Sequence, residues 1–140
     1  MSDVVTLRYD VIPGDFIKAG EASSDVKKKL MDIGISPDVI RKTAIAMYEG
    51  EINMVIHSLG GYAEISIYPN EITILLVDNG PGIDNVEQAM SAGFTTAPDD
   101  IRELGFGAGM GFPNMKKYTD EMIVESQPGI GTRVMMKVNI

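Results

Sequence analysis

Three polar residues recur at intervals of four in the middle of the chain: Glu49, Asn53 and His57. At this spacing, side chains lie along one face of an α-helix. A carboxylate can act as a general base, and a carboxamide oxygen one turn later suits Mg²⁺, which keeps water and phosphate as most of its ligands. The same pattern is also typical of a solvated helix face, so the spacing alone leaves both interpretations open.

A second group of residues follows the most apolar strand expected in the chain. The segment Asp78-Asn79-Gly80-Pro81-Gly82 places a carboxylate at the end of that strand, where it can accept a hydrogen bond from the amino group of adenine. Its glycines would let a planar ring approach the backbone. Asn-Gly is also a common hairpin turn, although the residues after Gly82 are typical of a helix rather than of a partner strand.

Two further glycine-rich segments lie closer to the C-terminus. The run from Gly105 to Gly111 precedes an expected helix, where exposed backbone N–H groups and the helix dipole favour an anion. It matches neither a dinucleotide fingerprint nor a P-loop, and a flexible loop is an alternative interpretation. In Gly129-Ile130-Gly131-Thr132, the threonine hydroxyl can reach a ligand or simply cap a turn.

The apolar pattern predicts the elements that would hold these residues. We expect a strand over 4–11, a helix over 15–31 weakened by Gly20 and Ser23-Ser24, a helix from Pro37 to His57, a hairpin of 63–68 and 72–77, a short helix near 86–92, a helix over 111–118, and strands over 121–126 and 132–140. This order predicts an α/β (α+β) two-layer sandwich, whose mixed, mostly antiparallel sheet is covered on one face by helices.

Length and composition narrow the function classes. At 140 residues we expect one domain, residues 1–140, and the net charge of −8 disfavours nucleic acid and anionic membranes as partners. The absence of cysteine excludes a disulfide framework, a thiolate zinc site and a cysteine nucleophile. No apolar run approaches the roughly 20 residues needed to span a bilayer, and no secretory signal begins the chain, so we expect a soluble, cytoplasmic protein.

Four motifs in a fixed order give the chain a family resemblance. They are Glu49-x-x-x-Asn53, Asp78-x-Gly80-x-Gly82, Gly107-x-Gly109-x-Gly111 and Gly131-Thr132. Together they resemble the nucleotide-binding boxes of the GHKL superfamily, which includes the gyrase B subunit, heat-shock 90 chaperones, mismatch-repair ATPases and histidine kinases. The chain is most similar there to small bacterial anti-sigma factors with serine kinase activity, through Asn53–His57, Phe94-Thr95-Thr96, Gly109–Phe112, Asp120-Glu121 and Val124-Glu125-Ser126.

The resemblance implies a histidine-kinase-type (Bergerat-like) domain that binds ATP and Mg²⁺, with a mobile lid at about 93–111. It implies that Asn53 is the magnesium ligand, that Glu49 is the general base for a substrate serine, and that Asp78 binds the adenine amino group. The other implied cofactor-binding residues are Gly80 and Gly82 beside the base, Thr132 at the adenine end, Gly107, Gly109 and Gly111 around the phosphates, and Thr95, Thr96 and Arg102 in the lid. His57 is interpreted as structural.

The resemblance leaves two functional hypotheses. The first is a serine kinase that phosphorylates an anti-anti-sigma partner and sequesters a sigma factor, with a homodimer as its possible assembly. The second is a non-catalytic, ATP-dependent binding module, which is favoured by Ala97 where the family pattern leads us to expect lysine, and by the long 101–108 segment. A domain that has lost nucleotide binding is a third possibility. We do not expect a stand-alone histidine kinase, because the only histidine, His57, lies inside the nucleotide-binding box and we expect no separate dimerisation and phosphoacceptor domain.

Overall fold

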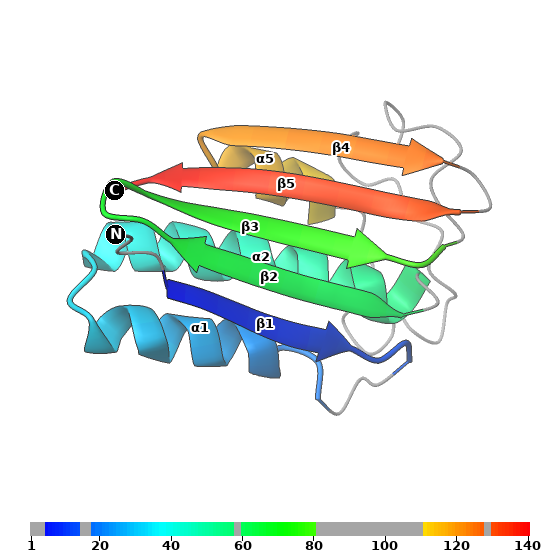
Figure 1. Cartoon of the computed structure of the whole chain (residues 1–140), viewed down its shortest axis with the longest axis horizontal. Coiled ribbons are helices and arrows are strands. Elements are labelled where there is room, and N and C mark those ends of the chain that lie inside the picture. Colours follow the sequence, from blue (N-terminus) through cyan, green and yellow to red (C-terminus); the bar gives the residue numbers. More distant parts are fainter. Residues whose placement is uncertain (1–4, 15–17, 58–59, 81–110, 128–129) are drawn as a thin grey trace.

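The structure is a computed structural model that describes residues 5–14, 18–57, 60–80, 111–127 and 130–140. Its strands and helices in chain order are β1 (Val5–Val11), α1 (Glu21–Asp32), α2 (Pro37–His57), β2 (Gly61–Ile67), β3 (Glu71–Asp78), α5 (Gly111–Lys117), β4 (Glu121–Gln127) and β5 (Gly131–Asn139). The strands form one sheet in the order β1-β2-β3-β5-β4, and the described helices lie behind it (Figure 1). This arrangement confirms the predicted two-layer α+β fold, with only antiparallel pairing among the described strands.

The core lies between the sheet and the helices because the strands alternate buried and accessible residues. On β3, for example, Ile72, Ile74 and Leu76 are buried and the residues between them are only partly buried. The helices meet this face with their own buried side chains, which include Val26, Leu30, Ala46, Met47, Met54 and Met115. None of the helices described here is long and apolar enough to cross a membrane.

Helix α2 packs tightly against the sheet at Gly50. A Cβ atom built on Gly50 would lie 2.1 Å from Cδ1 of Leu76 on β3. Leu76 is only 3% exposed, so its side chain has little room to move aside. The missing side chain at Gly50 therefore sets how near α2 packs against β3.

The main correction to the sequence prediction concerns the first helix. We predicted a helix from Asp15 to Met31, but α1 begins at Glu21, and residues 18–20 form a bend and turn. Gly20 is the N-cap with φ of 96°, a left-handed conformation that suits glycine. A right-handed helix cannot run through this conformation, so α1 begins at the next residue. The other described elements confirm the predicted ones with shifts of one or two residues, and the helix expected near 86–92 lies outside the described residues.

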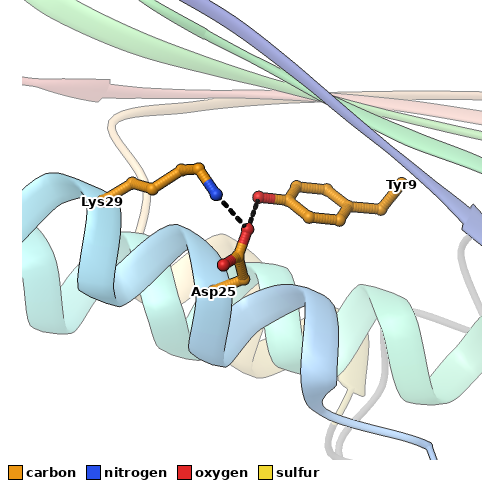
Figure 2. Close-up of polar contacts among 3 residues, drawn as sticks. All are labelled: Tyr9, Asp25 and Lys29. Carbon is orange, nitrogen blue, oxygen red and sulfur yellow. Dashed lines mark hydrogen bonds and ion pairs between the residues drawn. The ribbon is translucent and has the colours of Figure 1, made fainter.

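Helix α1 is tied to β1 by a polar cluster. Figure 2 shows the Asp25 carboxylate between the Tyr9 hydroxyl of β1 and the Lys29 ammonium group. Tyr9 donates a hydrogen bond to Asp25 Oδ2, and Lys29 Nζ lies 2.6 Å from the same oxygen. Burial, and then the hydrogen bond to Asp25, raises the pKa of Tyr9, and the Lys29 hydrogen bond lowers the pKa of Asp25.

The close approach at Gly50 reverses the usual effect of replacing a helical glycine. Gly→Ala inside a helix normally stabilises by about 1 kcal/mol, but here the added methyl group overlaps Leu76, and overpacking costs about 1–3 kcal/mol. We expect Gly50→Ala to lower the free energy of unfolding in urea. Adding Leu76→Val should recover part of that loss, because it removes the atom that clashes. An equally stable or more stable Gly50→Ala single variant would contradict the packing described above.

The Tyr9 cluster predicts a stability loss in alkaline solution. Because its folded-state pKa is raised, Tyr9 contributes stability that is complete below its ordinary pKa of 10.0 and is lost as the pH rises toward the folded value. We expect Tyr9→Phe to be less stable than the parent at pH 8, and the gap to narrow above pH 10. Thermal unfolding across this range measures the gap, with Tyr68→Phe as the control for an exposed tyrosine. A gap that stays constant with pH would contradict this assignment.

Candidate functional site

Asp78 stands at the end of β3, in the middle of the sheet. Its Oδ1 accepts hydrogen bonds from the backbone N–H groups of Thr132, at 2.9 Å, and Gly80, at 3.1 Å. Within the described part of the chain, both hydrogen bonds to this carboxylate end on Oδ1, so Oδ2 is left to accept from a ligand. The carboxylate is therefore oriented by the backbone, and no described residue donates to its other oxygen.

Two glycines let the neighbouring strands close around Asp78. Gly61 on β2 is its register partner, and a Cβ atom there would lie 2.0 Å from the carbonyl oxygen of Val77. A Cβ atom on Gly131 of β5 would lie 2.3 Å from the carbonyl oxygen of Asp78. Any side chain at either position would push the strands apart, which explains why glycine stands at both.

Thr132 lies beside Asp78 and belongs to a hydroxyl pair. It is 7% exposed, and its Oγ1 lies 2.9 Å from the Oγ of Ser126 on β4. Ser126 Oγ also donates to the carbonyl oxygen of Gly131, at 3.3 Å. Ser126 is not among the expected site residues, although the alternation of β4 places residues 122, 124 and 126 on the half-buried side.

Helix α2 contributes Glu49 and Asn53, which are both half-buried. Glu49 Oε1 accepts a hydrogen bond from Asn114 Nδ2 of α5 at 3.4 Å, a contact that sequence reasoning missed because the two residues lie 65 positions apart. Among the described residues the Asn53 carboxamide makes no hydrogen bond, so its oxygen is available to a metal ion. Within the described ranges, no group of three or more His, Cys, Asp or Glu residues is placed so that it could hold a metal ion.

The C-terminal end of α2 packs against β2 where that strand pairs with Asp78. Figure 1 shows that β3 ends and β5 begins at the same end of the sheet, and that α2 runs behind the sheet toward that end. Met54, next to Asn53, makes this contact with β2. Its Cε lies so near Gly61 that a Cβ atom built there would be 2.8 Å away. The end of α2 therefore packs against the strand that pairs with Asp78.

Glu51 has a separate role that sequence reasoning missed. Its side chain is 4% exposed and caps the first turn of α1. Oε2 accepts from the backbone N–H groups of Gly20 (2.9 Å) and Ala22 (3.3 Å), and Oε1 accepts from that of Ser23 (3.2 Å). Such N–H groups have no partner within their own helix, and a carboxylate from α2 supplies one here.

Of the expected site residues, Asp78, Gly80 and Thr132 are in direct hydrogen-bond contact, Glu49 and Asn53 lie one turn apart on α2, and Gly111 is the first residue of α5. Six other expected site residues lie outside the described residues and stay predictions: Gly82, Thr95, Thr96, Arg102, Gly107 and Gly109. The same holds for the lid at about 93–111, apart from Gly111. His57 is the last residue of α2, and its proposed structural role also stays a prediction.

Comparisons with known proteins agree with this geometry. The family model described as histidine kinase-, DNA gyrase B-, and HSP90-like ATPase matches residues 33–140. The anti-sigma F factor of Clostridium beijerinckii is 37% identical over 109 residues, which cover 71% of each chain. The anti-sigma F factor of Clostridium novyi is 40% identical over 102 residues, covering 69% of this chain and 66% of that protein. The chain therefore spans about two thirds of the length of these relatives.

The Glu51 cap predicts a difference between two neighbouring carboxylates. Glu51→Ala would leave three buried or partly buried N–H groups of α1 without their acceptor, and we expect a loss of about 1–3 kcal/mol in the free energy of unfolding. Glu49→Ala is the matched control on the same helix, and it should cost less because Glu49 makes one long contact. Urea denaturation of both variants measures the difference. Equal losses would show that the cap adds nothing specific.

Proposed function

We propose that this chain, which belongs to the histidine kinase-, DNA gyrase B- and HSP90-like ATPase family, is an ATP-dependent anti-sigma factor with protein-serine kinase activity. The observation that carries the proposal is the carboxylate of Asp78, which backbone amides orient through Oδ1 while no described residue donates to Oδ2. An acceptor of this kind suits the amino group of adenine. The regulatory role is proposed from the similar proteins, which are anti-sigma F factors.

Each described site residue has a distinct task in this proposal. Asp78 and Thr132 bind the adenine end of ATP, and Asn53 supplies the protein oxygen for Mg²⁺. When bound, ATP would supply its γ-phosphoryl group and leave as ADP, and Mg²⁺ would neutralise part of the negative charge on the phosphates. Glu49, one helical turn before Asn53, accepts the proton from the hydroxyl group of the substrate serine. Asn114 holds the Glu49 carboxylate from α5, and this contact orients the base.

We propose an anti-anti-sigma protein as the phosphate acceptor and a sigma factor as the sequestered partner, as the names of the relatives suggest. The chain carries a net charge of −8, which suits a partner with a basic face. The homodimer and the cytoplasmic location stay predictions.

A non-catalytic nucleotide switch is the second candidate function. Ala97 stands where the family pattern leads us to expect lysine, and a missing cation affects phosphoryl transfer more than nucleotide binding. A switch of this kind would bind its partner differently in the ATP and ADP forms and would leave the partner unphosphorylated.

Two variants separate transfer from binding. We expect Glu49→Gln to bind Mg-ATP like the parent, because the base does not hold the nucleotide, and to lose phosphate transfer to the partner serine. Asn53→Ala should instead lose the magnesium-dependent part of ATP binding. Calorimetric titration of ATP with and without Mg²⁺ measures binding, and mass spectrometry of the partner measures transfer.

The outcomes distinguish the two candidates. Phosphoserine on the partner with the parent protein, and none with Glu49→Gln, supports the kinase. Nucleotide-dependent binding of a partner that stays unphosphorylated with the parent protein supports the switch. Unchanged transfer by Glu49→Gln would remove Glu49 as the base, and a folded parent protein that binds no ATP would overturn both candidates.

A further inference from the structure

The hydroxyl groups of Ser126 and Thr132 have only two hydrogens between them for the hydrogen bonds that they make. Each hydroxyl carries a single hydrogen and two acceptor lone pairs. The carbonyl oxygen of Gly131 can only accept, at 3.3 Å, whereas either hydroxyl could donate in the 2.9 Å contact between Ser126 and Thr132. Both contacts are made at once only when Ser126 donates to Gly131 and Thr132 donates to Ser126. The Thr132 hydroxyl then has no hydrogen left, and only lone pairs remain for a ligand.

The backbone of Thr132 is engaged as well, because its N–H group donates to Oδ1 of Asp78 at 2.9 Å. Every donor of Thr132 is thereby directed toward protein atoms. Asp78 contributes a carboxylate, which accepts and does not donate. The two side chains that face the proposed adenine end therefore present hydrogen-bond acceptors alone.

We propose that Ser126 is a positioning residue that turns the Thr132 hydroxyl into an acceptor and so makes the site select 6-amino purines over 6-oxo purines. The inference rests on the proposed binding of ATP at Asp78. The amino group at position 6 of adenine carries two hydrogens, and it can donate one to each of two acceptors. Hypoxanthine and guanine carry a carbonyl oxygen there, which would face the Thr132 lone pairs and leave both sides without a hydrogen.

The Ser126→Ala variant tests the proposal in the full chain. Without Ser126, the Thr132 hydroxyl is free to rotate and can donate to a 6-oxo group. The probes are ATP and ITP, which differ at position 6 and in the protonation of the adjacent ring nitrogen, and calorimetry gives the ratio of their dissociation constants. We expect the preference for ATP to fall roughly tenfold in Ser126→Ala, about the worth of one hydrogen bond. Ser66→Ala, on the uncovered face of β2, is the control and should keep the parent ratio.

A double-mutant cycle adds a readout that a purely structural role would not move. If Ser126 acts through Thr132, then Thr132→Val also lowers the preference for ATP, and adding Ser126→Ala to it changes the ratio no further. Thermal unfolding of each variant confirms that the fold is retained.

Three results would overturn the proposal. Equal weakening of ATP and ITP by Ser126→Ala would leave Ser126 with a packing role only. An unchanged ratio in a variant that binds ATP would remove Ser126 as a determinant and leave the proposed function intact. A folded parent protein that binds neither nucleotide would overturn the proposed function together with this inference.

Discussion

The contact between Gly50 of α2 and Leu76 of β3 is the constraint on which the rest of the site depends. Successive residues of an α-helix point about 100° apart, so fixing Gly50 against the sheet also fixes the directions of its two neighbours. Glu49 then points toward α5 and Asn114, and Glu51 points to the opposite side, where it caps α1. Three consecutive residues thus set the depth of the helix, the direction of a candidate base and the position of the next helix. A shift or rotation of α2 would change all three together.

A second constraint acts at the end of β3, where two glycines without side chains stand on the neighbouring strands. Gly61 and Gly131 allow the backbones of β2 and β5 to approach Asp78 more closely than any Cβ atom would permit. This approach brings the N–H group of Thr132 within hydrogen-bond distance of the carboxylate. The glycines therefore act on the candidate site through the backbone, although neither offers a group to a ligand.

Local signals in the sequence were sufficient for most elements but not for their contacts. Helix α2 was predicted at its observed bounds because Ser36-Pro37 marks its start and Gly60-Gly61 follows its end. The predicted start of α1 was wrong because the cap comes from Glu51. This residue lies 28 to 31 positions after the N–H groups that it accepts from, and no local pattern indicates such a partner. The same reason hid the contact between Glu49 and Asn114. The glycine motifs placed Asp78 and Thr132 at the site, whereas the hydrogen-bond directions around them required the fold.

The hydrogen bonds of Glu51 and Asp78 separate a structural carboxylate from one available to a ligand. Backbone N–H groups hold both carboxylates, those of Gly20, Ala22 and Ser23 at Glu51 and those of Gly80 and Thr132 at Asp78. At Glu51 the two oxygens are both used, one by Ser23 and the other by Gly20 and Ala22, so the group is committed to the fold. At Asp78 the two described bonds converge on one oxygen and leave the other. Burial alone would rank Glu51 first as a functional residue, but a carboxylate recognises a ligand only with an oxygen that the protein has not already used.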